Sequence, residues 1–412
     1  MSALLLPLLL AVVVGCGLLI AHTYVLFPGL LLHGLRHWPR PAPLVWDEAT
    51  PPAELPTVAV LVAAYNEQKV VEEKIRRTFA STYPRDKITL YLGSDASTDQ
   101  TDTIIQRLQA EFGADRVVFR RFPGRTGKIQ IINSLAETVT ADVLVMTDAN
   151  VFFSPEALFE MVKYLRDPRV GLIGGNILNE EVRREGISVQ ERAYLLRENQ
   201  VKHQEGRLWG AMMGAFGGCY TLRRAVFRPV PETFLNDDFW QSMQVVTQGF
   251  RTLTALEALV YEDVSNVLFE EFRRKVRIGT GNFQNLHYFR RLLWPAAPGS
   301  VGIAFAFWSH KVFRWLTPHL LLLALAATAG GVALTTGTAA GFGWQAALAA
   351  QLAGPLLTGV DRLLRRAGWN LRLLRFNTHF YAMNYAMLLG WWRYVKAPVE
   401  TSVWTPTERF QW

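Results

Sequence analysis

A carboxylate and an amide follow an apolar run in the middle of the chain. Val143 to Met146 lead directly into Thr147, Asp148, Ala149 and Asn150. Such a run is typical of a buried strand in a parallel sheet, and ligands of open α/β sheets bind beyond the carboxyl ends of the strands. Asp148 and Asn150 would therefore offer hard oxygen ligands to a divalent cation that holds a diphosphate. The alternative is that Asp148 only caps a following helix.

Two earlier turns carry polar side chains to the same predicted edge. The first strand leads into a turn that contains Ala63, Tyr65 and Glu67, and the second leads into Asp95. A carboxylate such as Asp95 can accept the N–H of a uracil-type base, whereas Asp99 is better explained as a helix cap. A dinucleotide site is not indicated, because no GxGxxG pattern follows the first strand.

A basic residue begins the helix that follows the third predicted strand. Gly127 and Lys128 would bring backbone N–H groups and a cation to one place, which suits a phosphate group. The run Arg125 to Lys128 lacks the full P-loop spacing. A lysine on a solvated helix face is the alternative explanation.

Two adjacent carboxylates, Asp237 and Asp238, begin a later helix. Acidic residues in a first turn most often interact with the helix dipole. A sharper interpretation makes one of them a general base for a sugar hydroxyl. Upstream, Gly218 would allow a ligand to approach the backbone closely, and Trp209 would either pack in the core or face a sugar ring.

A basic cluster lies near the end of the alternating region. Arg274 and Arg277 share one helix face. Arginine forks bind phosphate oxygens, which would suit a leaving diphosphate. Contact with an anionic membrane leaflet is the alternative.

The elements that must position these side chains alternate between strand and helix character. Strands are predicted over 57–63, 88–93, 117–120, 143–146 and 170–177. Helices are predicted over 67–80, 99–112, 127–138 and 189–204, with another that starts at Pro155. This βαβ order predicts an α/β domain with a mostly parallel sheet and helices on both faces.

The composition indicates a soluble part and a membrane part. The chain has 412 residues, is 50% hydrophobic and carries a net charge of +8. The sequence contains no dense basic run with interleaved aromatic residues, so a nucleic-acid partner is not indicated. The two cysteines, Cys16 and Cys219, form no CxxC pattern, so neither a zinc site nor a disulfide framework is indicated.

Apolar segments lie on both sides of the predicted α/β domain. Residues 1–35 predict an N-terminal transmembrane helix, and the basic residues that follow place the next domain in the cytoplasm. A proline-rich linker spans 36–56 and the catalytic domain 57–267. Amphipathic or interface helices span 268–315, a transmembrane region 316–396 and a cytoplasmic tail 397–412. Segment 376–395 is either a third C-terminal span or an interfacial helix.

Six short motifs in this order resemble the membrane-bound inverting glycosyltransferases of family 2. That family includes cellulose, hyaluronan and poly-N-acetylglucosamine synthases and ceramide glucosyltransferase. The motifs are Ala-Ala-Tyr-Asn-Glu (63–67), Ser-Asp-Ala-Ser-Thr-Asp (94–99), Gly-Lys (127–128), Thr-Asp-Ala-Asn (147–150), Asn-Asp-Asp (236–238) and Arg-x-x-Arg (274–277). The resemblance covers roughly residues 57 to 280 and implies a GT-A fold, which is Rossmann-like.

The resemblance also implies a role for each matching residue. Asp238 would be the catalytic base, and Asp95 would bind the base of the nucleotide. Lys128 would bind the phosphate region, Asp148 would contact the nucleotide, and Arg277 would be the arginine of the Gln-x-x-Arg-Trp motif. Asp148 and Asn150 would stand at the metal position for Mg or Mn. The remaining substrate-binding candidates are Ala63, Tyr65, Glu67, Gly218, Asp237 and Arg274.

Two departures from the family pattern affect the expected reaction. Asn150 replaces an aspartate, which should weaken the hold on the metal. Arg274 and Ile278 replace the glutamine and tryptophan of the last motif. The missing tryptophan argues against polymerisation, so we expect transfer of one sugar from a UDP-sugar to a lipid or saccharide acceptor, in glycolipid or exopolysaccharide biosynthesis.

Two alternatives remain open at this point: a processive polysaccharide synthase, and a non-catalytic scaffold that senses nucleotide. The expected location is the inner (plasma) membrane, with a multi-pass chain and a cytoplasmic catalytic domain. At this location, partner subunits could export the product.

Overall fold

The computed structural model describes residues 2–40, 42–179, 188–262, 268–296, 299–369 and 371–396. The chain divides into two compact units. One unit comprises the described residues of Leu35–Asn266 and Pro295–Ile303. The other is Met1–Gly34 with Val267–Trp294 and Ala304–Ala397. The predicted cytoplasmic tail, 397–412, lies outside the described residues.

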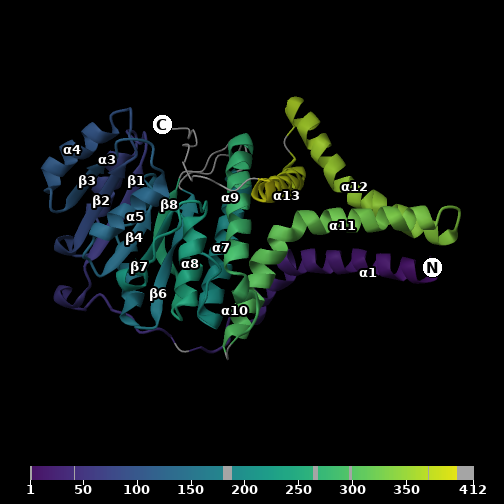
Figure 1. The fold of residues 1–412 in the computed structure, drawn as a ribbon, viewed down its shortest axis with the longest axis horizontal. Helices are drawn as coiled ribbons and strands as arrows, with labels where there is room; N and C mark the ends of the chain where they lie inside the picture. The colour runs from purple at the N-terminus through teal and green to yellow at the C-terminus, as the bar shows by residue number, and fades with distance from the viewer. Residues whose placement is uncertain are drawn as a thin grey trace. The chain divides into compact units, whose positions relative to one another are not determined.

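The first unit is built on one mixed sheet with the strand order β3-β2-β1-β4-β7-β6-β8-β5 (Figure 1). Neighbouring strands are parallel in the pairs β1–β2, β2–β3, β1–β4 and β6–β8, and antiparallel in the pairs β4–β7, β6–β7 and β5–β8. The strands are β1 (Val58–Ala64), β2 (Ile88–Ser94), β3 (Val117–Arg121), β4 (Val143–Thr147), β5 (Val151–Phe153), β6 (Val170–Asn179), β7 (Cys219–Arg223) and β8 (Arg251–Glu262). The predicted α/β class with a mostly parallel sheet is confirmed.

The strand register brings four chain segments to one edge. Ala64 at the end of β1 faces Ser94 at the end of β2. Strand β4 runs parallel to β1, so Asp148 leaves the sheet at the same edge. Strand β7 runs the opposite way and pairs its first residue, Cys219, with Thr147. The residue before β7, Gly218, therefore lies beside Asp148.

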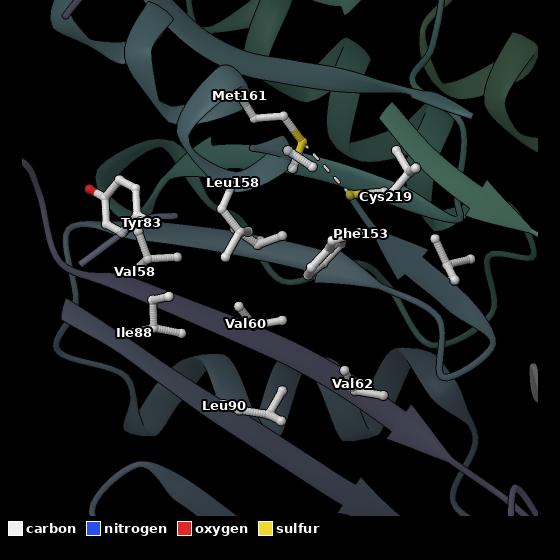
Figure 2. Packing of buried hydrophobic residues seen from close by; sticks show 14 of the residues in the cluster. Val58, Val60, Val62, Tyr83, Ile88, Leu90, Phe153, Leu158, Met161 and Cys219 are labelled. Carbon is white, nitrogen blue, oxygen red and sulfur yellow. Dashed lines mark hydrogen bonds between the residues drawn. The ribbon is translucent and has the colours of Figure 1, made fainter. Parts of the chain in front are cut away.

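Alternating side chains of β1 pack into the buried clusters on the two faces of the sheet. Val58, Val60 and Val62 belong to one buried cluster, and Ala59 and Leu61 belong to another. Figure 2 shows part of the first cluster, in which Leu158, Met161 and Cys219 lie near these valines. Helices α3 (Val71–Phe79), α4 (Thr101–Phe112) and α6 (Ala157–Val162) contribute to the first cluster, and α5 (Lys128–Thr138) and α8 (Asp237–Thr247) contribute to the second. The sheet thus has helices on both faces, as the sequence predicts.

Helix α7 (Ser188–Trp209) packs against β6 and β8. The side chain of Asn199 donates to Asn176 Oδ1 at 2.7 Å and to the Ile177 carbonyl at 3.0 Å. At the end of the helix, a Cβ added to Gly302 would come within 2.2 Å of Trp209 Cδ1. Trp209 therefore packs against backbone, which agrees with the simpler of its two interpretations.

The end of α7 also holds the segment that follows residue 34. The guanidinium of Arg207 donates to the carbonyls of Leu35, Arg36 and Trp38, at 2.8, 2.5 and 2.9 Å. Three carbonyls of an irregular segment thereby gain a charged donor. Arg207, together with Arg40, whose Nε donates to the Leu208 carbonyl at 3.1 Å, fixes the start of the predicted linker to the α/β domain.

The second unit is helical. Its helices are α1 (Ser2–Ala21), α2 (Phe27–Gly29), α9 (Leu268–Tyr288), α11 (Phe313–Leu334), α12 (Ala339–Arg366) and α13 (Arg372–Lys396). Helix α10 (Ser300–Ala306), which precedes α11, is divided between the two units. Within this unit α1 packs along α11 (Figure 1). Two helical stretches of the described chain, Leu4–Gly34 and Ser300–Leu334, are long and apolar enough to cross a membrane. The predicted segments 344–360 and 376–395 lie in α12 and α13, and their membrane crossing stays a prediction.

Close contacts join α13 to α9 and to α12. A Cβ on Gly390 of α13 would come within 2.8 Å of the backbone of Gly279, so α9 and α13 approach at two glycines. Asp361 of α12 is buried and pairs with Arg375 of α13 at 3.2 Å. The Thr378 hydroxyl donates to the same carboxylate at 2.8 Å. A buried carboxylate satisfied in this way fixes the register of α12 against α13.

Candidate active site

Asp148 leaves β4 in a tight turn rather than at the start of a helix. Its backbone N–H donates to the Gly218 carbonyl at 3.2 Å, and its own carbonyl accepts from the N–H of Val151 at 3.2 Å. Strand β5 begins at Val151, so Asp148 caps no helix. Its carboxylate is about a third exposed, at 32%. The ligand interpretation of Asp148 is therefore preferred over the cap.

Lys128 connects two of the acidic residues. Its Nζ lies 2.7 Å from Asp148 Oδ1 and 3.5 Å from Asp237 Oδ2. Burial alone would lower the pKa of Lys128, but the charges of Asp148 and Asp237 outweigh that effect and raise the pKa well above its ordinary value. Lys128 is therefore a fixed cation of the site and does not lie on a solvated helix face.

Asp238 lies in the first turn of α8, beside the loop that precedes β7. Its Oδ1 accepts from the backbone N–H of Phe239 at 2.7 Å. A Cβ added to Gly217 would lie 3.1 Å from Asp238 Oδ2, so the loop backbone approaches this carboxylate closely. Burial, and then the neighbouring charge of Asp237, raise the pKa of Asp238 to about 6. Such a carboxylate is ionised at neutral pH and basic enough to accept a proton.

Asp95 is enclosed by the residues that lead into α5. Its carboxylate accepts from Arg125 Nε at 3.1 Å, from the N–H of Thr126 at 2.5 Å and from the N–H of Gly127 at 3.2 Å. The Arg125 guanidinium also lies 3.4 Å from the centroid of the Tyr65 ring. Two planar groups and a carboxylate thus meet beyond the ends of β1 and β2.

The two groups of side chains are joined by four consecutive residues. Arg125 to Gly127 bind Asp95, and the next residue, Lys128, binds Asp148. Gly127 has a φ of 92° at the cap of α5, a conformation that residues with a side chain rarely adopt. This turn lets one short segment contact the ends of both β2 and β4.

The comparisons with known proteins agree with this arrangement. The model of "Glycosyltransferase like family 2" matches residues 56–281, which is more than half of the chain. The chain belongs to glycosyltransferase family 2. The family predicted from the motifs, and with it the glycosyltransferase domain, is confirmed.

Two curated relatives are similar to this chain over part of its length. A beta-monoglucosyldiacylglycerol synthase of Synechocystis sp. is 27% identical over 184 residues, which is 43% of this chain and 38% of that protein. An N-acetylglucosaminyltransferase of Rhizobium leguminosarum bv. viciae is 23% identical over 258 residues, 60% of this chain and 59% of that protein. The chain thus spans about two fifths to three fifths of the length of these relatives.

A solved structure shares the fold. The mannosyltransferase PcManGT from Pyrobaculum calidifontis, in complex with GDP-Man and Mn²⁺, superposes with a TM-score of 0.66 at 22% identity. The match covers 96% of this chain and 99% of that one. The GT-A-like architecture of the family 2 domain is therefore confirmed.

The other predicted residues of the first unit have mainly structural contacts. Ala63 is in β1 opposite Gly93 and packs against the cluster of α5. The backbone N–H of Glu67 donates to Thr101 Oγ1 at 2.8 Å, which joins the first turn to α4. A Cβ on Gly218 would come within 2.9 Å of Ile177 Cδ1, so Gly218 packs closely against β6 beside Asp148. Asp99 accepts from the N–H of Thr101 at 3.0 Å and supports the start of α4, as expected.

The two predicted arginines of the last motif lie in α9 of the helical unit. Arg274 Nε lies 2.9 Å from Glu271 Oε2, and its Nη2 lies 3.1 Å from Oε1 of the same carboxylate. Lys275 also binds Glu271, at 3.1 Å. Arg274 is thus engaged within its own helix, and the phosphate contacts of Arg274 and Arg277 stay predictions.

Three cations near the family 2 site were not among the predicted residues. Arg125 stacks on Tyr65, Lys74 is buried beneath the turn of Asp148, and Lys202 lies 3.3 Å from the centroid of the Phe216 ring. The charge of Lys202 is one of the influences that lower the pKa of Asp238. The spacing of Val71, Lys74 and Thr78 on one helix face was the signal that could have indicated Lys74.

The donor atoms for a divalent cation fit the predicted site in part. Asp148 supplies a carboxylate that is about a third exposed and that binds Lys128 through Oδ1. Asn150 is only 4% exposed, and its Nδ2 has no hydrogen-bond partner among the described residues. No group of three or more His, Cys, Asp or Glu side chains that could hold a metal occurs in the described chain. The protein thus offers one carboxylate and one buried amide, and a diphosphate would have to supply further oxygens.

Proposed function

We propose that this protein transfers a sugar from a nucleotide sugar to a hydroxyl group of a lipid or saccharide acceptor, with inversion at the anomeric carbon. One observation carries the proposal: Asp238, with its pKa raised to about 6, lies beside a fixed cation and two further carboxylates at the carboxyl edge of a family 2 sheet. This combination supplies a base and a phosphate contact at one place.

The nucleotide base would bind where Tyr65, Arg125 and Asp95 meet. The 3.4 Å between the Arg125 guanidinium and the centroid of the Tyr65 ring is a stacking distance. A flat base could therefore stack on the guanidinium in place of the ring, or on the ring in place of the guanidinium. The Asp95 carboxylate can accept but not donate hydrogen bonds, and uracil and guanine each present an N–H donor on the pairing edge. A UDP-sugar is the favoured donor, and a GDP-sugar fits the same chemistry.

The diphosphate would bind between Lys128 and Asp148. Lys128 is a permanent cation at the start of α5, where backbone N–H groups add to the positive field. Asp148 and Asn150 would hold Mg²⁺ or Mn²⁺ against the diphosphate oxygens. When bound, the cation supplies Lewis-acid stabilisation of the departing diphosphate.

The chemical step would be a single displacement. Asp238 accepts the proton of the acceptor hydroxyl, the acceptor oxygen forms a bond to the anomeric carbon, and the bond from that carbon to the diphosphate oxygen breaks. The electron pair leaves with the nucleoside diphosphate, whose growing charge Lys128 stabilises. One displacement from the face opposite the leaving group inverts the anomeric centre.

The acceptor would be presented at a membrane. Two apolar stretches, Leu4–Gly34 and Ser300–Leu334, have the length of membrane spans. The basic residues Arg36 and Arg40 support a catalytic domain on the cytoplasmic side of the inner membrane. The similarity to a synthase of glucosyldiacylglycerol supports a lipid acceptor. Transfer of one sugar is favoured over polymerisation, because Ile278 replaces the tryptophan of the polymer synthases.

The test is a donor panel on the purified full chain in detergent. UDP- and GDP-sugars are supplied with Mn²⁺ and a membrane lipid extract, and both nucleotide release and the mass of the lipid product are measured. We expect one donor to give a lipid that is heavier by a single sugar. Asp238→Asn should abolish this product, whereas Asp86→Asn, an exposed aspartate before β2, should not.

Three other results would contradict parts of the proposal. A ladder of products would indicate a processive synthase. Nucleotide binding without turnover of any donor would indicate a non-catalytic sensor. Undiminished transfer by Asp238→Asn would remove the base assignment.

A further inference from the structure

A fully buried lysine lies directly beneath the edge that carries Asp148. Lys74 is in α3 and has no exposed surface. Its Nζ donates to Thr147 Oγ1 at 2.8 Å and to the Val151 carbonyl at 2.5 Å, and lies 4.1 Å from the centroid of the Phe153 ring. All three partners belong to β4 or β5. Figure 2 shows Phe153 within the buried cluster on this face of the sheet.

The two hydrogen bonds of Lys74 enclose the turn that carries the predicted diphosphate and metal contacts. Thr147 is the last residue of β4 and Val151 is the first of β5. Asp148, Ala149 and Asn150 are the only residues between them. One ammonium group therefore binds both ends of this turn from below, while the Gly218 carbonyl binds the N–H of Asp148.

A lysine is a costly residue for this position if packing is its only role. Burial lowers the pKa of Lys74 to about 7, although the charge of Asp148 acts in the opposite direction. An apolar side chain of the same length would fill the space without the cost of removing a cation from water. The remaining advantage of the ammonium is its directional contact with both strands, since each of its N–H groups can bind a different acceptor.

We propose that Lys74 is a positioning residue that fixes the turn of Asp148 and Asn150 in the geometry that receives the diphosphate of the donor. Lys74 itself does not touch the substrate. The inference rests on the proposed function, because it assigns Lys74 to the diphosphate end of the nucleotide-sugar site. Two lysines would then support Asp148 in different ways. Lys128 binds its carboxylate, and Lys74 binds the residues on both sides of the turn that carries it.

The test compares diphosphate and monophosphate binding, because only the diphosphate end depends on the turn. Calorimetry on the full chain in detergent, with Mn²⁺, gives the Kd of UDP and UMP, and of GDP and GMP. In the wild type the diphosphate should bind more tightly than the monophosphate. In Lys74→Met this advantage should fall at least tenfold while the Kd of the monophosphate is unchanged. The KM of the donor should rise and the KM of the acceptor should stay the same.

Two further variants separate positioning from general stability. Thr78→Val removes a buried hydroxyl that binds the Lys74 carbonyl at 2.8 Å, one turn further along the same helix. It should lower the melting temperature without changing the ratio of diphosphate to monophosphate affinity. Thr147→Val removes one of the two acceptors of the ammonium and should reduce the ratio. Combining it with Lys74→Met should reduce the ratio by less than the product of the two separate effects, because both variants break the contact of Lys74 with Thr147.

An unchanged ratio in a folded Lys74→Met variant would overturn the inference while leaving the proposed function intact. If Lys74→Met does not fold, an unchanged ratio in Thr147→Val would overturn it equally. If the wild type binds none of the four nucleotides, both the inference and the proposed function fail.

Discussion

The protonation of Asp238 should set the acid limb of the pH profile. Between its ordinary value of 3.8 and about 6, the difference in pKa corresponds to about 3 kcal/mol, which measures how strongly the site disfavours the charged form. Only the ionised form can accept a proton, so kcat/KM should fall about tenfold for each pH unit below about 6. At pH 5 the activity should be about a tenth of its plateau value.

Changing the neighbours of Asp238 should move this limb in opposite directions. The charge of Asp237 raises the pKa of Asp238, so Asp237→Asn should move the limb to lower pH. The charge of Lys202 lowers that pKa, so Lys202→Met should move the limb to higher pH. Burial is the largest cause of the raised pKa and is unchanged in both variants. The limb of Asp237→Asn should therefore still lie above pH 4.

The free energy of unfolding should also depend on the protonation of Asp238 and should decrease as this carboxylate ionises. The pKa of Asp238 is higher in the folded than in the unfolded chain, so its contribution to stability is present at low pH and is lost as the pH rises through about 6. Asp238→Asn should consequently raise the melting temperature at pH 8 and have little effect at pH 4.

The assay is nucleotide release from the preferred donor between pH 4.5 and 8.5, with the nucleotide Kd measured in parallel to exclude a binding effect. A plateau that extends unchanged to pH 4.5 would refute the base assignment of Asp238. Shifts of Asp237→Asn and Lys202→Met in the same direction would refute the electrostatic explanation.

Three further predictions concern other residues of the site. Lys128→Met should lower kcat at least a hundredfold, since it removes the fixed cation opposite the diphosphate; circular dichroism and nucleotide release would separate this loss from unfolding. Arg125→Ala should raise the donor KM at least threefold and leave the acceptor KM unchanged, and equal changes in both constants would contradict stacking on the base. Gly217→Ala should lower kcat at least tenfold with little change in melting temperature, because the added methyl would lie 3.1 Å from Asp238 Oδ2; activity close to wild type would show that the loop can yield.

The parallel core was predictable because its signals are local. The four apolar runs that form β1 to β4 are bounded by turns and separated by amphipathic helices. The type and order of these secondary-structure elements therefore follow from the periodicity of the apolar residues. Parallel neighbours necessarily carry Asp95 and Asp148 to one edge, which is why those residues could be assigned together. The same logic found Lys128, because the start of a helix after a strand lies at that edge.

The antiparallel part was not predictable from local patterns. Strand β7 has five residues, and its place between β4 and β6 depends on partners distant in the sequence. The sequence therefore predicted that Gly218 approaches a ligand, but not that its carbonyl binds the N–H of Asp148. The burial of Asn150 likewise depends on the path of a three-residue turn, and that path is determined by tertiary contacts such as those of Lys74.

Arg274 illustrates a competition that motifs do not reveal. Its spacing from Arg277 predicted a phosphate contact, yet Glu271 lies one turn earlier and binds the guanidinium through two oxygens. A motif match reports which residue types are present, and ion pairs within the helix decide which of them are engaged.

The four residues from Arg125 to Lys128 make recognition of the two ends of the donor mechanically dependent. A base that binds Asp95 would compete with Arg125 for that carboxylate, and we expect a resulting shift of Arg125 to reach, through Thr126 and Gly127, the lysine that would oppose the diphosphate. Free pyrophosphate or a sugar phosphate without a base could occupy the phosphate end but could not release this segment. Such compounds should therefore be poor inhibitors, and hydrolysis of activated sugars by water should be suppressed until a complete nucleotide is bound.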